Sequence, residues 1–308
     1  MKSNDISLNL PSNIVDIRIG FIGAGRLGQA LAWSFTKTGL RVEAVSSMLM
    51  EHAQAFAESI NGCKCMESQE LVDACDLIFI TTPDSVIRHT CEGLTWHSGQ
   101  AVVHCSGVTE VDVLNRALAQ GSYIGGFHPM QTFGDPYAAV RSLPGCTITV
   151  EAEQPELMSL LLALVERLNC SANRLPAGMR GRYHAAAGYT SQFVNALFDQ
   201  AIRLWQTWGS TEEEALRALL PLAHGTLTAI QSVGVARGMP GPVSRGDLSS
   251  IDKHLHAISP MGDEMLNFYR TLCAATIPLA QRAGGIDSDD AQKFTDLLAT
   301  EILNCRKF

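Results

Sequence analysis

Hydrophobic positions in the first half of the chain alternate between short continuous runs and runs spaced as on one face of a helix. The continuous runs cover residues 13–23, 40–47, 76–83, 101–108, 122–129 and 145–153. Helically spaced runs separate them at residues 26–39, 50–62, 85–94 and 109–121. Continuous apolar runs are typical of strands buried on both faces, and strands that alternate with helices indicate a parallel, doubly wound α/β sheet.

The pattern changes beyond residue 155. Residues 155–169 are spaced as a helix, and residues 171–178 resemble one last edge strand. After Gly181 only helical spacing is evident, over residues 182–209, 215–230, 248–258, 265–282 and 291–303. The sequence therefore predicts a Rossmann-type domain over residues 1–178 and an all-helical domain over residues 179–308.

Composition narrows the class of protein. Of 308 residues 46 % are hydrophobic and 18 % charged, and the formal net charge is −8 with no long basic run. A core is therefore available, and neither nucleic acid nor an anionic membrane is the expected partner. Nine scattered cysteines without paired C-x-x-C spacing predict reduced thiols in a cytoplasmic protein and no metal site. The N-terminal residues lack the apolar core of a signal peptide.

A glycine motif follows the first apolar run. Gly23, Gly25 and Gly28 have the spacing G-x-G-x-x-G, with Arg26 and Leu27 inside it, where a strand ends and a helix begins. The first glycine permits a tight turn, the second lets a pyrophosphate approach the backbone, and the third lets the helix pack on the strand. We therefore expect a dinucleotide here, with its phosphates at the helix N-terminus.

Two further strand ends bear on the cofactor. The second strand ends at Ser46 and Ser47 without the carboxylate that would bind a ribose hydroxyl, which favours NADP over NAD. Thr81, Thr82 and Pro83 end a later strand at the edge where such sheets bind ligands, so they are predicted to contact the cofactor or to cap a helix.

Several segments together resemble one bacterial family. They are GFIGAGRLGQAL, DLIFITTPDSVI, VVHCSG, GGFHPMQTF, YHAAA and GPVSRGDLSSIDKHL. The family joins a Rossmann-like domain, labelled as a candidate NADP oxidoreductase of the deazaflavin-dependent type, to a helical domain of unknown function. The resemblance implies a fold similar to 6-phosphogluconate dehydrogenase, an NAD(P) cofactor, a substrate held between the domains and a homodimer formed through the helices. Relatives often carry Arg at the second strand tip, where this chain has Met48, which weakens the preference for NADP.

The resemblance also suggests residues for proton transfer. Several relatives use a lysine early in the helical domain, but this chain has no lysine between Lys64 and Lys253. Prephenate dehydrogenases have a similar histidine in a G-x-H-P-M segment and a serine after the preceding strand, which implies a role for His128 and, less directly, for Ser106. A strand-end histidine can instead simply hold a nearby carbonyl.

Three residues of the helical half complete the predicted site. His184 stands near the position of the relatives' lysine, and Asn195 follows three helical turns later on nearly the same face. Arg245 lies on a glycine-flanked loop and could bind a substrate carboxylate with its planar guanidinium. The alternatives are a histidine that caps its helix or lies at a dimer interface, and an arginine paired with Asp247 that only shapes the loop.

Three functions remain open from the sequence. The first is an NADP-dependent oxidoreductase that acts on a small anionic carbonyl, imine or hydroxy acid. The second is a prephenate-type hydroxy-acid dehydrogenase that uses His128. The third is a non-catalytic NADP(H) sensor whose N-terminal residues 1–13 contact a partner. A site filled by Met130 or Phe133 would favour the sensor.

Overall fold

The computed structural model describes residues 8, 10, 11 and 13–300. The N-terminal segment predicted to contact a partner of a sensor lies largely outside these residues, as does the end of the helix predicted over residues 291–303. The chain divides into two compact units, Met1–Gln192 and Phe193–Phe308. The boundary predicted after residue 178 falls in the loop before a helix that belongs to the first unit.

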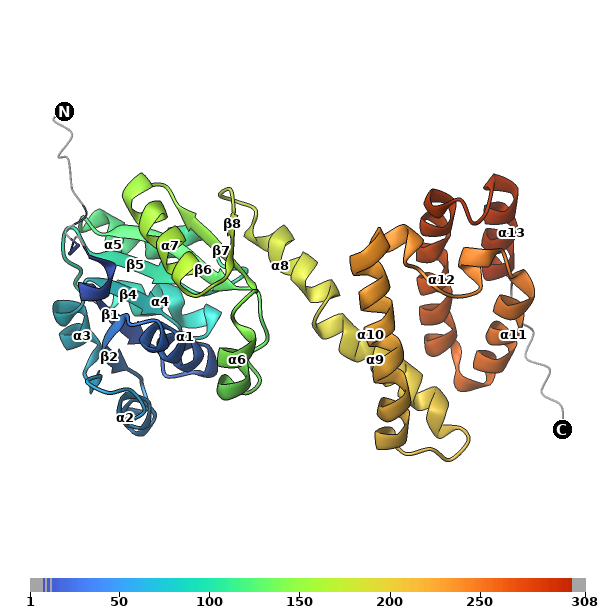
Figure 1. The fold of residues 1–308 in the computed structure, drawn as a ribbon, viewed down its shortest axis with the longest axis horizontal. Coiled ribbons are helices and arrows are strands. Elements are labelled where there is room, and N and C mark those ends of the chain that lie inside the picture. The colour runs from blue at the N-terminus through green and yellow to red at the C-terminus, as the bar shows by residue number, and fades with distance from the viewer. Residues whose placement is uncertain (1–7, 9, 12, 301–308) are drawn as a thin grey trace. The chain divides into compact units, whose positions relative to one another are not determined.

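The first unit is built on one sheet of eight strands (Figure 1) in the order β3-β2-β1-β4-β5-β6-β7-β8. The strands are β1 (Arg18–Ile22), β2 (Arg41–Ser46), β3 (Lys64–Cys65), β4 (Leu77–Ile80), β5 (Ala101–His104), β6 (Tyr123–Pro129), β7 (Thr147–Ala152) and β8 (Ser171–Arg174). The helices are α1 (Arg26–Lys37), α2 (Met50–Glu58), α3 (Ser68–Ala74), α4 (Ile87–Glu92), α5 (Asn115–Ala119), α6 (Pro136–Ser142), α7 (Pro155–Arg167) and α8 (Arg180–Tyr189). The predicted α/β architecture is confirmed, and the chain crosses from one half of the sheet to the other between β3 and β4.

One pair of strands departs from the parallel prediction. Strand β7 runs antiparallel to β6, with His128 opposite Thr149, and β8 then runs parallel to β7. The chain between β6 and β7 holds only the short helix α6, so it turns back instead of crossing over the sheet. Antiparallel strands near the edge of a parallel sheet are common in doubly wound folds.

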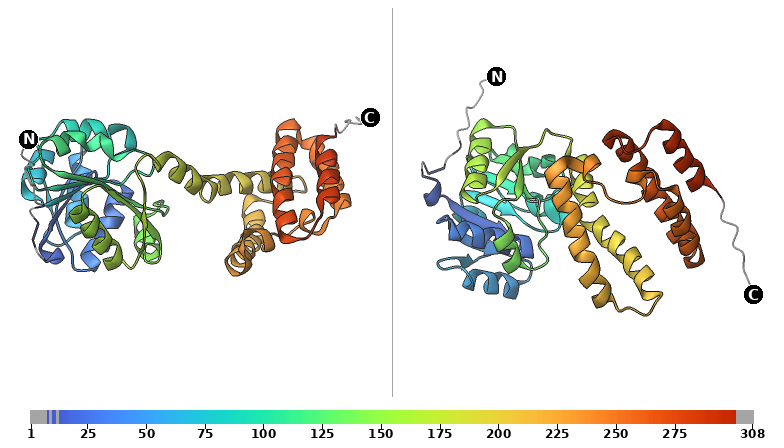
Figure 2. Two further views of the ribbon diagram at one scale, coloured as in Figure 1. Left: turned by 90° about the horizontal axis from the view of Figure 1, so that it is seen from above. Right: turned by 45° about the vertical axis from the view of Figure 1, so that its right-hand side comes forward.

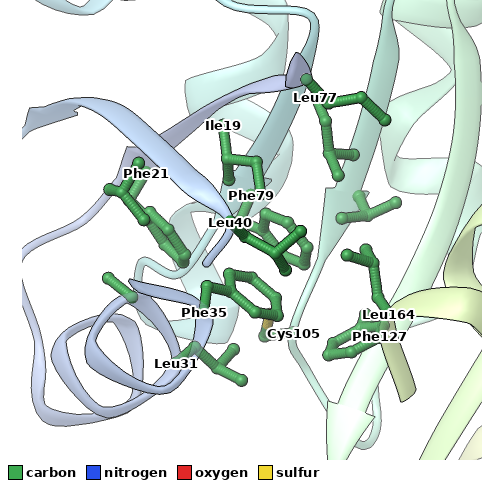
Figure 3. Close-up of a cluster of buried hydrophobic side chains, with 14 of the residues drawn as sticks. Ile19, Phe21, Leu31, Phe35, Leu40, Leu77, Phe79, Cys105, Phe127 and Leu164 are labelled. Atoms are coloured by element: carbon green, nitrogen blue, oxygen red, sulfur yellow. The ribbon is translucent and has the colours of Figure 1, made fainter. Parts of the chain in front are cut away.

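Helices cover both faces of the sheet (Figure 2), and each face has its own hydrophobic cluster. On one face α1, α2 and α7 pack around stacked phenylalanines (Figure 3), where the rings of Phe21 and Phe79 lie 5.2 Å apart. On the other face α3, α4 and α5 contribute residues such as Leu71, Ile87 and Ala117. This double coverage explains the continuous apolar runs in the strands.

The second unit is helical throughout its described residues. It contains α9 (Gln192–Gln206), α10 (Glu212–Arg237), α11 (Leu248–Ile258), α12 (Asp263–Ala283) and α13 (Ser288–Ala299), with the first residue of α9 belonging to the first unit. Its core lies mainly among α11, α12 and α13. Helix α10 alone is long and apolar enough to cross a membrane by length and composition, among the residues described, and none of its most apolar stretch is buried.

The prediction of a single helix over residues 182–209 is wrong. The helical segment is interrupted after Tyr189 by a turn at Thr190 and Ser191, whose hydroxyls both donate to the carbonyl of Ala187. Hydroxyl side chains that bond to the preceding turn often bend or end a helix. The expectation that His184 and Asn195 share a helix face therefore fails, because the two residues lie on different helices in different units.

Candidate functional site

The glycine turn between β1 and α1 is shaped by close packing. Gly23 has φ +117°, and a Cβ there would lie 2.8 Å from the carbonyl carbon of Thr81. A Cβ on Gly28 would lie 2.7 Å from the Thr81 hydroxyl. Both positions are therefore closed to any side chain, the first by conformation and contact, the second by the approach of α1 to β4.

Gly25 differs, because nothing in the protein itself demands a glycine there. Its φ is an ordinary −75°, and a Cβ would meet only the Thr81 carbonyl oxygen, at 4.0 Å. Gly25 is the N-cap of α1, provides no side-chain cap and is exposed together with Arg26. Space above a helix N-terminus with no side-chain cap fits a phosphate group, so the residues present fit a dinucleotide.

The tip of β2 presents one of its two hydroxyls. Ser46 is 2 % exposed, and its Oγ lies 2.7 Å from the Oγ of Ser68, while its carbonyl accepts a hydrogen bond from the Gly23 amide. Ser47 is partly exposed, and Met48 after it is 98 % exposed. Ser47 is thus the hydroxyl that the tip of β2 offers to a ligand.

The three residues that follow β4 also differ in their contacts and exposure. The Thr81 hydroxyl donates to the carbonyl of Gly23 at 2.8 Å and so helps to hold the turn. The Thr82 hydroxyl is buried without a hydrogen-bond partner, and Pro83 is exposed. A buried hydroxyl without a partner fits a place where water or a ligand completes the bonding.

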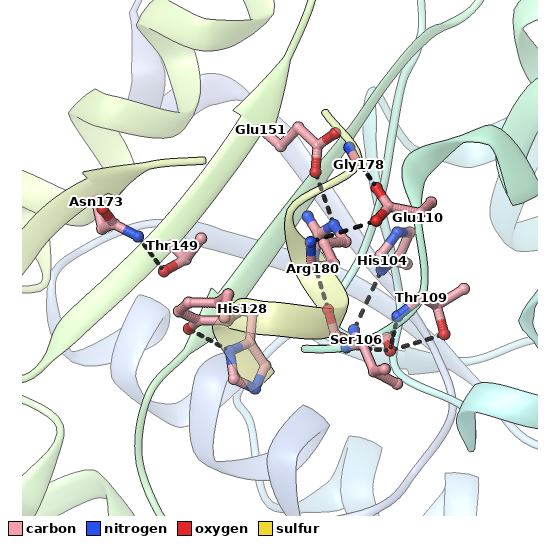
Figure 4. Close-up of polar contacts among 12 residues, drawn as sticks. His104, Ser106, Thr109, Glu110, His128, Thr149, Glu151, Asn173, Gly178 and Arg180 are labelled. Carbon is pink, nitrogen blue, oxygen red and sulfur yellow. Dashed lines mark hydrogen bonds and ion pairs between the residues drawn. The ribbon is translucent and has the colours of Figure 1, made fainter. Parts of the chain in front are cut away.

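The histidine at the end of β6 is paired with a tyrosine from α8. His128 Nδ1 lies 2.7 Å from the phenol oxygen of Tyr183, and the two rings meet edge to face with their centroids 5.5 Å apart. Figure 4 shows His128 on the side of the site where Thr149 and Asn173 lie. Thr149 accepts a hydrogen bond from the Asn173 amide of β8 at 3.0 Å. The pair therefore rests on the antiparallel edge of the sheet.

Gly107 leaves room for two imidazole rings. A Cβ on this residue would lie 2.6 Å from the His184 ring and 2.9 Å from Nε2 of His128. The centroids of the two imidazole rings are 6.2 Å apart. The structure thus brings His128, His184 and the loop after β5 together.

His128 is held in its neutral form. Burial lowers its pKa to about 4, and the positive charges of His184 and Arg180 act in the same direction. Burial raises the pKa of Tyr183, while hydrogen bonding from Thr149 and the charge of Arg180 oppose that rise. Near neutral pH the pair is therefore an uncharged imidazole bonded to a protonated phenol.

The Ser106 side chain forms hydrogen bonds within its own loop. Its hydroxyl donates to Thr109 Oγ1 at 2.9 Å and accepts hydrogen bonds from the amides of Val108 and Thr109. The residue is 5 % exposed. Its observed contacts therefore shape the loop that carries Gly107, and a direct role in proton transfer remains a prediction.

Arg180, at the start of α8, was missed by the sequence analysis. The side chain is fully buried, and it donates to Glu151 at 2.7 Å and to the carbonyl of Ser106 at 2.6 Å (Figure 4). Its Nη2 has no hydrogen-bond partner, and the guanidinium packs so closely on Gly126 that a Cβ there would overlap it. Burial raises the pKa of Glu151 although the guanidinium opposes this. The signal available in the sequence was a charged residue, Glu151, near the end of an otherwise apolar strand.

His104 lies beneath the site without opening onto it. The residue is completely buried, its Nδ1 accepts from the Ser106 amide at 3.2 Å, and its Nε2 has no partner. Burial, assisted by the charge of Arg180, lowers its pKa to about 3. Cys105 is also buried, which raises its thiol pKa and leaves it a poor nucleophile. No cluster of three or more potential metal ligands occurs among the residues described.

Two predicted site residues belong to the second unit. Arg245 is exposed at the end of a short 3₁₀ turn, Val243–Arg245, and Asp247 caps α11 by accepting from the Ser250 amide at 3.0 Å. Asn195 lines a cavity of about 460 Å³ between α9 and α10. Their roles toward the first unit remain predictions.

Comparison with known proteins gives two family matches. Residues 18–107 match the model of the family described as "NADP oxidoreductase coenzyme F420-dependent". Residues 146–276 match the model of a domain of unknown function, DUF2520. No curated protein sequence matches the chain.

Solved structures share the fold. A candidate NADP oxidoreductase from Bacteroides fragilis is 23 % identical over 86 % of this chain and 100 % of its own, with a TM-score of 0.69. Protein TM1727 from Thermotoga maritima is 20 % identical over 86 % of this chain and 98 % of its own, also with a TM-score of 0.69. A reductive aminase from Aspergillus terreus, solved with NADPH and ethyl-5-oxohexanoate, is 18 % identical over 91 % and 99 %, with a TM-score of 0.64.

These matches agree with the architecture and with the glycine turn that lies inside the first of them. The first matched segment contains β1 to β5, and the second contains β7, β8 and the helices through most of α12. The chain therefore carries one segment that matches the model of NADP oxidoreductases described as coenzyme F420-dependent, followed by a second segment that matches the DUF2520 model.

Proposed function

We propose that the protein is an NADP-dependent oxidoreductase that transfers hydride to or from a small anionic carbonyl, imine or hydroxy acid. The observation that carries this proposal is the neutral His128–Tyr183 pair at the end of β6, in the same unit as a glycine turn that is open to a ligand only at Gly25. Carboxyl ends of parallel strands form the edge where such sheets bind ligands. The matched oxidoreductase family and the NADPH in the fungal reductive aminase support the choice of cofactor.

Residues of the first unit would hold the dinucleotide. The α1 N-terminus at Gly25 and Arg26 would bind the pyrophosphate, and Ser47 would face the adenosine ribose without a carboxylate to repel a 2′-phosphate. Thr82, whose buried hydroxyl is unpaired, would gain a partner from the ligand. The bound nicotinamide supplies or accepts the hydride.

The direction of the hydrogen bonds suggests how a proton is delivered. Thr149 already accepts from Asn173, so its own hydroxyl can donate to Tyr183, which can donate to His128 Nδ1. The second nitrogen of a neutral His128, which lies against the backbone of Gly107, then carries the proton that would be donated. As that proton passes to a developing alkoxide or amine nitrogen, the phenol proton can replace it at Nδ1. The imidazole remains neutral, and the negative charge passes to the Tyr183 phenolate, which the Thr149 hydroxyl and the charge of Arg180 stabilise until solvent returns a proton.

The contacts of Met130 and Phe133 supply no support for the sensor. Met130 is 39 % exposed, and Phe133 packs against Ala30 and Val140 between α1 and α6. Neither observation indicates that these side chains fill the region next to His128. The prephenate-type dehydrogenase remains an alternative for the same histidine, with a hydroxy acid oxidised in place of a carbonyl reduced.

The proposal includes a homodimer in the cytoplasm. Helices α9 and α10 carry exposed apolar side chains, among them Leu197, Leu222 and Leu227. A second copy is the partner that a symmetric assembly would supply.

The test is a turnover assay on the full-length protein. NADPH is mixed with a panel of 2-oxo acids, cyclic imines and a deazaflavin, and NADPH absorbance is followed against a sample without protein. We expect one class of small anionic substrate to consume NADPH. NADPH binding without consumption by any member of the panel would instead support the sensor.

A further inference from the structure

Two cysteine sulfurs lie in contact at the antiparallel edge of the sheet, away from the residues assigned above. Sγ of Cys146 and Sγ of Cys170 are 3.8 Å apart. Both residues are half-buried. Positions 146 and 170 are distant along the chain, so the sequence alone predicts scattered reduced thiols.

The backbone holds this pair in place. Cys146 immediately precedes β7 and Cys170 immediately precedes β8, and the next residues, Thr147 and Ser171, are partners in the ladder. The amide of Ser171 donates to the carbonyl of Cys146 at 2.9 Å, and the amide of Gly145 donates to the carbonyl of Asn169 at 2.7 Å. Neighbouring strands lie about 4.8 Å apart, within the roughly 4.4–6.8 Å between Cα atoms that a disulfide spans.

We propose that Cys146 and Cys170 form an oxidation site, at which a small disulfide such as oxidised glutathione converts the two thiols to an intramolecular disulfide. One thiolate attacks the small disulfide, forms a mixed disulfide and releases one reduced thiol. The second cysteine then attacks the protein sulfur of that mixed disulfide and releases the other reduced thiol. The protein loses two protons and two electrons, and the small disulfide gains them.

Burial of the two thiols slows their oxidation. It raises the pKa of Cys146 to about 12 and also raises that of Cys170, whose sulfur additionally lies 3.1 Å from the carbonyl of Leu143. Both thiols are therefore protonated near neutral pH, and sustained exposure to the oxidant is needed. The proposal concerns which pair forms, and it does not depend on the function proposed above.

The pair matters because of what its strands carry. Thr149 of β7 and Asn173 of β8 are partners in the same ladder, and they are hydrogen-bonded to each other beneath Tyr183. Glu151, two residues further along β7, binds Arg180. A disulfide between Cys146 and Cys170 would therefore join β8 covalently to β7, the strand whose Glu151 binds Arg180 at the start of α8.

The experiment is cysteine mapping on the full-length protein. Protein incubated with oxidised glutathione is alkylated without reduction, digested and analysed by mass spectrometry. We expect a Cys146–Cys170 cross-linked peptide that disappears on reduction. Cys146→Ser and Cys170→Ser should each abolish it, whereas the matched double variant Cys63→Ser/Cys65→Ser should retain it, since those residues are also half-buried.

Some results would overturn the proposal. They are full alkylation of both cysteines after prolonged oxidation, glutathione retained on either one, or a dominant cross-link between Cys63 and Cys65. If a serine variant fails to fold, peptide mapping of the wild-type protein alone still decides between these outcomes.

Discussion

The proposed proton relay depends on what His128 contacts through its two ring nitrogens. Tyr183 bonds to one of them at 2.7 Å, and the other packs so closely on Gly107 that a Cβ there would lie 2.9 Å from it. Desolvation keeps the ring uncharged, with a pKa of about 4. An imidazole in this setting can relay a proton without storing a charge.

Replacement of either member of the pair should impair chemistry and leave the cofactor bound. We expect His128→Asn and Tyr183→Phe each to reduce the turnover rate by about 10²–10⁴-fold, because proton transfer is lost. Affinity for NADPH should change little, since the glycine turn is intact. Steady-state rates and calorimetric titration measure the two effects. The exposed His52→Asn is the control, and an unchanged rate in both site variants would refute the relay.

The buried histidines should also make the protein sensitive to acid. The pKa values of His104 and His128 fall from 6.5 to about 3 and about 4, so the unfolded chain binds more protons than the folded one between these values. Stability is therefore complete above about pH 6.5 and decreases as the pH falls toward 4.

Urea unfolding at a series of pH values checks this dependence. His104→Asn should flatten the decrease in unfolding free energy between pH 6.5 and pH 4, whatever its effect at pH 7. The exposed His52→Asn should leave the slope unchanged. Equal slopes for wild type and His104→Asn would count against the assignment of His104 as a neutral buried residue.

Some residue roles could be predicted from the sequence and others could not. The glycine spacing is local, so the turn at Gly23 and the packing at Gly28 follow from neighbouring residues. Ser46 and Ser106 were predicted to face ligands, but their hydroxyls bond to Ser68 and Thr109, contacts that depend on loop geometry. Arg180 was missed because its partner Glu151 comes from a strand 29 residues earlier.

At the scale of elements, helix α8 is attached to the sheet through its first residue. The Arg180 side chain is completely buried and donates hydrogen bonds to Glu151 of β7 and to the carbonyl of Ser106. The Arg180 backbone amide donates a hydrogen bond to the Glu110 carboxylate at 3.3 Å. These contacts set where Tyr183 lies, since it follows one turn later on the same helix. Arg180 is thus a positioning residue for the His128 pair.

Loss of this attachment should destabilise the first unit. Arg180→Met leaves Glu151 as a buried carboxylate without its partner, a change that typically costs about 3–5 kcal/mol. The free energy of unfolding in urea measures the loss. Arg182→Met, on the exposed side of the same helix, should change stability by less than about 0.5 kcal/mol. Similar values for the two variants would contradict the role of Arg180.

The elements themselves were largely predictable, because hydrophobic period is a local property. All six strands predicted from continuous runs are present, as is the less regular edge strand β8. The direction of β7 and the break at Thr190 were not predicted. The first depends on how the chain between β6 and β7 turns, and the second on hydroxyl bonds to Ala187 that compete with helix continuation.

At the scale of the whole molecule, two helices of the second unit carry exposed apolar side chains. Leu222 is 66 % exposed and Leu227 is 62 % exposed on α10, and Leu197 is 42 % exposed on α9. Large exposed apolar side chains that gather on one face usually mark an interface. A homodimer through these helices would cover them.

Light scattering on the purified protein tests the assembly. We expect twice the 33.3 kDa chain mass at micromolar concentration, because a second copy buries the exposed faces of α9 and α10. The double variant Leu222→Asp/Leu227→Asp should shift the protein toward the monomer, since two charges would be buried in the interface. A wild-type protein that stays monomeric would contradict the prediction.

The most direct measurement of the central claim is calorimetric titration of the folded protein with NADPH and with NADH. We predict binding of both, tighter for NADPH, because Ser47 at the tip of β2 leaves a 2′-phosphate unopposed by any carboxylate. Gly25→Val should abolish the heat of binding while circular dichroism stays unchanged, since its side chain would occupy the space above the α1 N-terminus. Absence of NADPH binding to wild type, or undiminished binding to Gly25→Val, would contradict an NADP-dependent oxidoreductase built on this turn.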